Sequence, residues 1–446
     1  MSENLSSIKG LDARKAAWEV IQAVGGGAFA DVALERIFNL YSFKSIDKGL
    51  ITELSYGAIR QRYYLDCWID YLGKVPAKKQ PPLLRWLLHL GLYQVLKMKR
   101  IPPAAAINTT VELAKTHHLK KLAPVVNGIL RSALRSKERG LLLPKSNNPS
   151  LELAKNESLP VWLAEELIAW KGVEHAQQIA KAFNSVSPID IRVNKLRADL
   201  KDVKELFDTC GIQNQLIPNC PSGLEVRAGV GEPRKWPGYE EGKWSVQDRS
   251  SQLIAPSLGP LPGEKILDAC AAPGGKSTHI AELINNEGNL WSVDRSSRRS
   301  KKILANSERL GTKCLQILVA DSNELLLKKP DWKGFFDRIL IDAPCSGLGT
   351  LARHPDARWR MNQDNIQQLV AVQSQLLNSL APLLKNGGKL VYSTCTIHPE
   401  ENSHQIKNFL QSKSEFLLEY EKQIWPGEGD NGDGFYIAVL NKLNNQ

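Results

Sequence analysis

The 446-residue sequence contains no run of 18 apolar residues that could cross a membrane. Its most apolar segment, residues 82–98, is interrupted by Arg85, His89 and Gln94, which predicts a helix facing a protein core. The first thirty residues carry scattered charges and no apolar centre, which argues against an export signal. We therefore expect a cytoplasmic protein without a membrane-bound segment.

The cysteines lack the spacing that a disulfide framework or a zinc site requires. Their number, seven, is odd, and no two are separated as Cys-x-x-Cys, so we expect reduced thiols and no bound metal. His117 and His118 are neighbours, and on a helix they would point in different directions. The cysteines outside any motif, which we interpret as small core residues, are Cys67, Cys210, Cys220 and Cys314.

Positive charge is concentrated in the first third of the chain. Residues 1–150 hold 23 lysines and arginines against 11 aspartates and glutamates, a net charge of +12. The whole chain carries +11, so the remaining residues have a net charge of −1. This asymmetry favours a polyanionic partner, because basic side chains that neutralise phosphates release counterions. A basic surface that only keeps the protein soluble is the alternative.

Hydrophobic periodicity predicts a helical first part. Up to about residue 140, apolar residues recur every three or four positions. The expected helices span residues 12–24, 31–40, 48–71, 82–97, 104–115 and 122–136. A tract at 143–149 with prolines and asparagines is typical of a linker. The next segment, up to about residue 242, mixes expected helices at 160–170 and 200–209 with extended runs at 189–194 and 223–226.

From residue 243 onward, short apolar strands alternate with amphipathic helices. The expected strands are 265–268, 290–294, 315–320, 338–342, 389–393 and 435–440, and the expected helices include 276–284, 298–310 and 363–384. This alternation predicts parallel strands and crossover helices in a doubly wound α/β sheet. We therefore predict three domains: an all-α domain (1–143), a small mixed α+β domain (150–242) and a Rossmann-like α/β core (243–446).

The loop after the first strand of this core has the sequence DACAAPGGKST (268–278). Gly274 and Gly275 let the backbone approach a ligand, but their spacing fits neither a nucleotide-phosphate loop nor the dinucleotide fingerprint. Asp294 ends the second strand, where a carboxylate can bind the hydroxyls of a ribose. Asp321 ends the third strand, where it could meet the amine of an adenine. Adenosine recognition without a phosphate loop points to S-adenosylmethionine.

Two cysteines follow the fourth and fifth strands. Cys345 lies in IDAPCSGLG (341–349) and Cys395 in VYSTCTIHPEEN (391–402). Both are loop positions, where a reactive thiol is accessible. Carbon 5 of a pyrimidine becomes nucleophilic when a thiolate attacks carbon 6, so a thiol beside a methyl donor suits covalent catalysis. Asp342 could support charge at ring nitrogen 3, and either a local backbone dipole or Lys276 could favour deprotonation of the attacking thiol.

These motifs resemble those of the RNA 5-methylcytosine methyltransferase family. The matching segments are VQDRSSQ (246–252), DACAAPGGK (268–276), Asp294, Asp321, DAPCSG (342–347), RHPD (353–356), STCT (393–396), PEEN (399–402) and DGFY (433–436). The resemblance implies that Cys395 attacks the base and that Cys345 assists release of the enzyme. DNA cytosine methyltransferases attack with a Pro-Cys cysteine that Glu-Asn-Val follows, and residues 346–348 do not match that pattern.

The resemblance also implies a cofactor and a substrate. S-adenosylmethionine would contact Asp294, Asp321 and Asp342 together with the loop after the first strand. The loop residues concerned are Cys270, Ala271, Ala272, Pro273, Gly274, Gly275 and Lys276. The basic N-terminal helices resemble the NusB-type domain of the ribosomal branch of the family, which implies a monomeric enzyme acting on small-subunit ribosomal RNA. Two alternatives stay open: a transfer-RNA methyltransferase, and a non-catalytic RNA-binding factor with a vestigial core.

Overall fold

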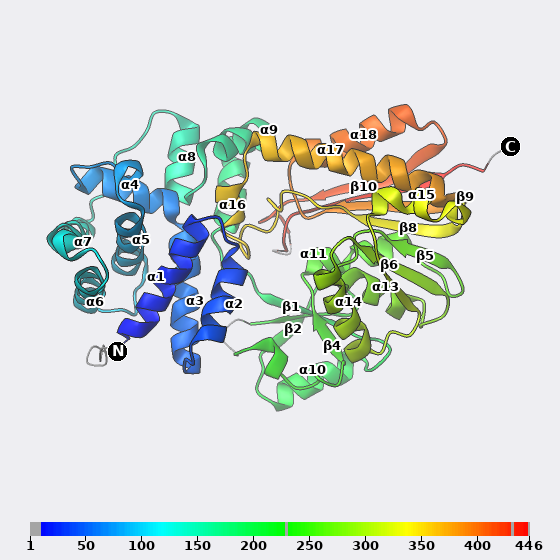
Figure 1. Cartoon of the computed structure of the whole chain (residues 1–446), viewed down its shortest axis with the longest axis horizontal. Helices are drawn as coiled ribbons and strands as arrows, with labels where there is room; N and C mark the ends of the chain where they lie inside the picture. Colours follow the sequence, from blue (N-terminus) through cyan, green and yellow to red (C-terminus); the bar gives the residue numbers. More distant parts are fainter. Residues whose placement is uncertain (1–9, 228–230, 430–431, 445–446) are drawn as a thin grey trace. The chain divides into compact units, whose positions relative to one another are not determined.

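The computed structural model describes residues 10–227, 231–429 and 432–444. The chain forms two compact units (Figure 1). The helical unit comprises residues 1–185 together with residues 353–360, and the sheet unit comprises residues 186–352 and 361–446. Within the described ranges, no helix has both the length and the apolar character needed to cross a membrane.

The helical unit is built around α5, whose residues are buried on all sides. Leu87, Leu88, Leu90 and Leu92 have no exposed surface, as expected for a helix that is apolar all round. Pro82 lies in its first turn, where the fixed φ of proline suits a helix start. The helices of the unit are α1 (Leu11–Gly25), α2 (Ala30–Leu40), α3 (Ser45–Arg60), α4 (Arg62–Leu72), α5 (Pro82–Lys97), α6 (Pro103–Thr116), α7 (Ala123–Glu138), α8 (Pro149–Glu157), α9 (Val161–Ala182) and α16 (Ala357–Arg360).

The prediction of one helix over residues 48–71 is wrong, because the chain breaks at Gln61 between α3 and α4. The break leaves the first amides of α4 without helical acceptors. The hydroxyl oxygen of Ser158 accepts hydrogen bonds from the amides of Tyr63 (3.0 Å) and Tyr64 (3.2 Å). A residue nearly a hundred positions away thus stabilises the break, and local periodicity cannot reveal such a contact.

The sheet unit contains a small antiparallel sheet with strand order β2-β3-β1-β4. Its core is aromatic: Phe207 packs edge-on against Trp236 and Trp244, with ring centroids 6.1 and 5.7 Å apart. The elements are β1 (Ile189–Val193), α10 (Leu200–Thr209), β2 (Asn214–Leu216), β3 (Gly223–Val226) and β4 (Trp244–Val246).

The large sheet of this unit has the strand order β10-β11-β9-β8-β5-β6-β7. Its strands are β5 (Lys265–Asp268), β6 (Asn289–Asp294), β7 (Leu315–Val319), β8 (Phe336–Asp342), β9 (Leu384–Thr394), β10 (Phe416–Ile424) and β11 (Phe435–Lys442). Its helices are α11 (Arg249–Gln252), α12 (Ile254–Leu258), α13 (Gly275–Leu283), α14 (Ser297–Leu310), α15 (Leu325–Lys328), α17 (Gln363–Leu380) and α18 (Ser403–Ser412).

Strands β5 to β9 pair in parallel, as the alternating pattern predicts. The expectation that the last strand is also parallel is wrong: β11 runs antiparallel to β9, and β10, which the pattern did not predict, runs antiparallel to β11. β5 has β6 on one side and β8 on the other, so the direction of winding reverses at β5. Doubly wound sheets bind ligands at such a switch point.

Candidate active site

The sheet unit brings the predicted site residues together at the carboxyl ends of its parallel strands. Asp268, Asp294 and Asp342 are the last residues of β5, β6 and β8. Asp321 lies just beyond β7, and Cys395 directly follows β9. Because β9, β8, β5, β6 and β7 are neighbours in that order, the two cysteines lie on one side of the switch point, and Asp294 and Asp321 lie on the other.

The loop after β5 turns into α13 through Gly274, which has a φ of +102°. A side chain is disfavoured there both by this conformation and by Ile303, whose Cα would lie 3.2 Å from an added Cβ. The hydroxyl of Ser277 donates to Asp268 at 2.6 Å and ties the first turn of α13 back to β5. The sequence from Cys270 to Lys276 thereby forms a closely held turn at a helix N-terminus, where backbone amides point outward.

Asp294 and the segment after β7 carry acceptors that fit an adenosine. Asp294, only 4% exposed, accepts hydrogen bonds from the amides of Ser296 (2.9 Å) and Ala272 (3.3 Å), and a carboxylate keeps further acceptor positions. Asp321 accepts from the amide of Asn323 at 2.9 Å. The buried side-chain oxygen of Asn323 has no hydrogen-bond partner among the described residues, so it can accept from the amine of a bound ligand.

Asp268 is fully buried beneath this loop. Burial raises the pKa of Asp268 to about 7; the hydrogen bond from Ser277 opposes the rise and the nearby charge of Asp342 adds to it. The carboxyl group therefore titrates near neutrality, in contrast to a carboxylate in water.

The two cysteines of the predicted site are in direct contact. The sulfur atoms of Cys345 and Cys395 lie 3.3 Å apart, within hydrogen-bond distance, and both side chains are half-buried. The amide of Gly349 donates to the carbonyl of Cys395 at 3.0 Å, and the amide of Gly434 donates to the carbonyl of Gly349 at 2.8 Å. A Cβ on Gly349 would lie 1.9 Å from the carbonyl oxygen of Gly434. This close backbone crossing holds the loop of one cysteine against that of the other.

The two thiols have different charged neighbours. Lys276 forms an ion pair with Asp342 at 2.6 Å. Burial lowers the pKa of Lys276, but the ion pair with Asp342 and the charges of Cys395 and Asp268 raise this pKa by more. The pKa of the Cys345 thiol is raised well above its ordinary value by its hydrogen bond with Cys395, by burial, and then by the charges of Cys395 and Glu401. Cys395 thus faces an ammonium group, whereas Cys345 faces a carboxyl group.

Sequence reasoning missed two buried residues that support the site. Arg192 in β1 is fully buried; it donates to the carbonyl of Gly275 at 3.0 Å and forms an ion pair with Glu282 at 2.7 Å. It thereby connects the small sheet to the loop after β5. Glu401, the last residue of the turn η7 (Pro399–Glu401), is the second. The motifs RVN and PEEN that contain them are visible in the sequence, but their burial is not.

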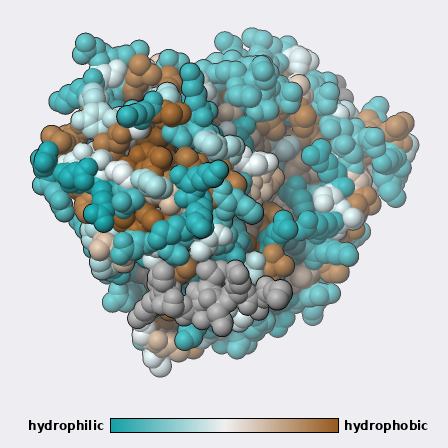
Figure 2. All heavy atoms as spheres, turned by 60° about the vertical axis from the view of Figure 1, so that its left-hand side comes forward, coloured by the Kyte–Doolittle hydropathy of each residue, from teal (hydrophilic) through white to brown (hydrophobic). Residues whose placement is uncertain are grey.

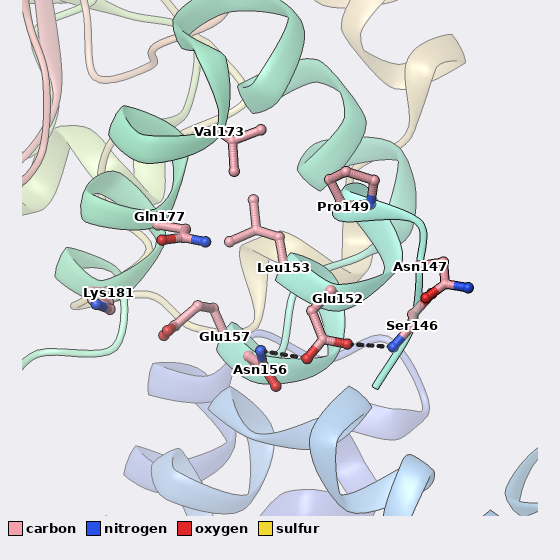
Figure 3. Close-up of a pocket in the computed structure, with 10 residues that line it drawn as sticks. All are labelled: Ser146, Asn147, Pro149, Glu152, Leu153, Asn156, Glu157, Val173, Gln177 and Lys181. Carbon is pink, nitrogen blue, oxygen red and sulfur yellow. Dashed lines mark hydrogen bonds between the residues drawn. The ribbon is translucent and has the colours of Figure 1, made fainter. Parts of the chain in front are cut away.

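The helical unit has hollows that contain none of the predicted site residues. A cavity of about 360 Å³ lies between α8 and α9 (Figure 3). The carboxylate of Glu152 in it already accepts from the Ser146 amide (2.8 Å) and the Asn156 side chain (3.0 Å). Hydrophobic residues also gather in a patch on the face shown in Figure 2. A groove of about 590 Å³ in the same unit includes Leu72, Val75, Leu84, Leu122, Val125 and Ile129 in its lining.

Three known protein families match successive segments of the chain. Residues 255–441 match the family described as 16S rRNA methyltransferase RsmB/F. Residues 11–135 match the NusB family, and residues 159–231 match the ferredoxin-like domain of RsmF/B-like methyltransferases. The predicted fold class, a Rossmann-like core with a NusB-like helical domain and a small mixed domain, is confirmed.

Similar proteins extend over almost the whole chain. A probable ribosomal RNA small subunit methyltransferase B of Synechocystis sp. is 37% identical over 97% of this chain and 100% of its own length. Ribosomal RNA small subunit methyltransferase B of Shigella boydii is 38% identical over 89% of this chain and 91% of its own. The crystal structure of PH0851 aligns with a TM-score of 0.82 at 26% identity, covering 98% of this chain and 99% of that one.

Proposed function

Because the chain belongs to the RsmB/F family of 16S rRNA methyltransferases, we propose that it methylates carbon 5 of a cytosine in small-subunit ribosomal RNA. We propose S-adenosylmethionine as the methyl donor and Cys395 as the attacking group. The observation that carries this proposal is the pair of thiols 3.3 Å apart, at the ends of neighbouring strands beside Lys276. The relatives named for ribosomal RNA support the substrate.

The residues around the loop after β5 suit the proposed cofactor. Asp294 would accept hydrogen bonds from the ribose, and Asp321 with Asn323 would meet the adenine, while residues 270–276 and Asp342 would line the remainder. S-adenosylmethionine, when bound, supplies an electrophilic methyl group. Two observations support this choice. The site offers hydrogen-bond acceptors for an adenosine, but its loop lacks the glycine spacing of a phosphate-binding loop. In addition, the side-chain oxygen of Asn323 has no hydrogen-bond partner among the described residues.

In the proposed reaction the Cys395 thiolate forms a bond from its sulfur to carbon 6 of cytosine. The Lys276 ammonium would attract the negative charge of the reacting sulfur. The ring electrons of the C5–C6 bond then become available at carbon 5, which would take the methyl group as the bond between that group and the donor's sulfur breaks and its electron pair stays on the sulfur. Asp342 would support charge at ring nitrogen 3, and its ion pair with Lys276 could supply the proton.

Release of the product reverses the covalent attachment. A base removes the proton from carbon 5, the C5–C6 double bond forms again, and the electron pair of the C6–S bond returns to Cys395. The Cys345 thiol, 3.3 Å from that sulfur, can donate a hydrogen bond to the departing thiolate. In this proposal Cys395 attacks the base and Cys345 assists release. A monomeric state and a cytoplasmic location stay predictions.

Methyl transfer to defined RNA tests this proposal. The purified protein is incubated with labelled S-adenosylmethionine and either small-subunit ribosomal RNA or transfer RNA, and the product nucleosides are identified by mass spectrometry. We expect 5-methylcytidine in the ribosomal RNA, which bisulfite sequencing would then locate. Transfer RNA as the preferred substrate would contradict the proposed target, and no methylated nucleoside with either RNA would favour a vestigial core.

A further inference from the structure

Glu401 is a carboxyl group with no exposed surface, held next to the two thiols. Its Oε2 atom accepts hydrogen bonds from the amide of Ser346 at 2.9 Å and from the side-chain nitrogen of Gln373 at 3.0 Å. The hydroxyl of Ser346 donates to Oε1. Two N–H donors on one oxygen favour the carboxylate form, although burial raises the pKa of Glu401.

The hydrogen bonds of Glu401 reach the neighbours of both cysteines. Ser346 follows Cys345, and its hydroxyl also lies 2.7 Å from that of Thr396, which follows Cys395. On the other side of Cys345, the carbonyl of Pro344 accepts from the side chain of Gln373 at 3.0 Å. The buried carboxylate therefore holds the backbone after Cys345 directly and the backbone before it through Gln373. Through the Ser346 hydroxyl it also reaches Thr396, beside Cys395.

The same carboxylate sets the charge around Cys345. The titratable groups that face this thiol are Cys395, Glu401 and Tyr392. Burial raises the pKa of Tyr392 well above its ordinary value, so the phenol is neutral; its hydroxyl donates to the carbonyl of Glu401 at 2.7 Å. Glu401 therefore adds its negative charge to that of a Cys395 thiolate, and nearby negative charge disfavours a second thiolate at Cys345.

We propose that Glu401 is a positioning residue of the methyltransferase site, which directs the Cys345 thiol toward Cys395 and keeps that thiol protonated. This inference rests on the proposed function, since it gives Glu401 its task through the release step. A protonated Cys345 can donate its hydrogen to the sulfur of Cys395 as the bond to carbon 6 breaks. Loss of Glu401 would therefore slow the release of methylated RNA more than the attack that precedes it.

Glu401→Gln keeps the size of the side chain and removes its charge. Glu400→Gln is the matched control, because this neighbouring carboxylate hydrogen-bonds Gln367 at 2.9 Å and not the cysteine loops. Full-length variants are mixed with small-subunit ribosomal RNA and S-adenosylmethionine, and the covalent complex is followed in time on a denaturing gel. We expect Glu401→Gln to resolve the complex at least about tenfold more slowly than the wild type, and Glu400→Gln to match the wild type.

The pH profile of complex resolution separates this role from a loss of packing. Release of RNA from the covalent complex needs protonated Cys345. The rate of release is therefore highest below the pKa of that thiol and falls as the pH rises through this pKa. Removing the negative charge of Glu401 lowers this pKa, so the alkaline limb of Glu401→Gln should move to lower pH. An unmoved limb together with wild-type resolution would overturn the inference.

Cys345→Ala on the same gel distinguishes the two proposals. If Cys345→Ala traps no complex, the covalent mechanism and the role of Glu401 are both wrong. If it traps one but Glu401→Gln releases RNA normally, only the role of Glu401 is wrong. If Glu401→Gln does not fold, Ser346→Ala tests the positioning role instead. This variant removes the hydroxyl that donates to Glu401 and keeps the charge of Glu401. We expect slower resolution with an unmoved alkaline limb, and wild-type resolution would contradict the inference.

Discussion

Asp294 joins two parts of the proposed cofactor site, since it ends β6 and accepts from the amide of Ala272 in the loop after β5. We expect Asp294→Ala to weaken S-adenosylmethionine binding by about 1.5–3 kcal/mol, the usual contribution of a hydrogen bond to a charged group. Isothermal titration calorimetry measures the affinity. Asp331→Ala, at an exposed position, is the control, and unchanged affinity in Asp294→Ala would rule out the ribose assignment.

Asp268 should make the stability of the sheet unit depend on pH. Its pKa in the folded protein is about 7, whereas an unfolded chain titrates aspartate near pH 4. Between these values the folded state binds more protons, so the free energy of unfolding falls as the pH rises. Asp268→Asn has no such charge to bury and should lack this fall, which between pH 5 and pH 8 is about 3 kcal/mol. Urea unfolding at pH 5 and pH 8 measures it, and parallel changes in both proteins would contradict the assignment.

Among single residues, the sequence predicts the positions of the proposed reactive groups better than the positions of the groups around them. Cys345, Cys395 and Asp294 could be found because each follows an apolar strand, and strand ends of a parallel sheet meet at one edge. Glu401 and Arg192 carry charges that normally lie on a surface. Their burial depends on partners 28 to 90 positions away, and no local pattern encodes such distances.

The segment 353–360 shows how one element can belong to a distant part of the chain. It lies between β8 and α17 in sequence, yet it packs in the helical unit. The fully buried guanidinium of Arg358 donates to the carbonyls of Ser158 (3.2 Å) and Phe183 (3.1 Å) and to the side chain of Asn184 (3.1 Å). Burial lowers the pKa of Arg358 to about 9. Within the helical unit, α16 is therefore anchored to the C-terminal ends of α8 and α9 through hydrogen bonds.

Arg358→Met removes these hydrogen bonds and keeps an unbranched apolar side chain at the buried position. It leaves the buried carbonyls of Ser158 and Phe183 without these donors, which should lower the unfolding free energy of the helical unit by about 2–4 kcal/mol. Hydrogen exchange in α8 and α9 measures the effect, with the exposed Arg298→Met as control. Equal protection in the two variants would mean that the segment contributes little to the unit.

Local patterns identify most elements but not how they pair. Periodicity located the parallel strands β5 to β9, because each contains a short run of apolar residues next to turn residues. It missed β10, whose sequence FLLEYEKQI places charged residues on an exposed edge strand and shows no clear alternation. The antiparallel direction of β11 follows from its pairing with β9 and β10, which only the folded sheet determines.

At the scale of the whole molecule, the distribution of charge suggests how RNA is held. Lys120 and Lys121 are exposed in the turn η2 (Lys120–Leu122), within the part of the chain that carries the net +12. We expect the affinity of the full chain for RNA to fall steeply with salt. Lys120→Gln/Lys121→Gln should reduce the slope of log K against log salt by about 0.7–0.9 for each phosphate that the lysines no longer neutralise.

Fluorescence anisotropy at several salt concentrations measures this slope. Lys407→Gln/Lys422→Gln, which removes two exposed lysines from the sheet unit, is the matched control and should leave the slope unchanged. Equal slopes in both double variants and the wild type would show that the lysines of η2 do not bind phosphate, and would favour a solubilising role for them.

The central claim is that Cys395 attacks the base and Cys345 assists release, and one denaturing gel tests it most directly. Each single alanine variant of the full chain is incubated with small-subunit ribosomal RNA and S-adenosylmethionine. Cys345→Ala should still attack and transfer the methyl group, and then stall as a slow-migrating covalent protein–RNA band. Cys395→Ala should form no band and show almost no methylation. A band from Cys395→Ala and none from Cys345→Ala would contradict the assignment and make Cys345 the nucleophile.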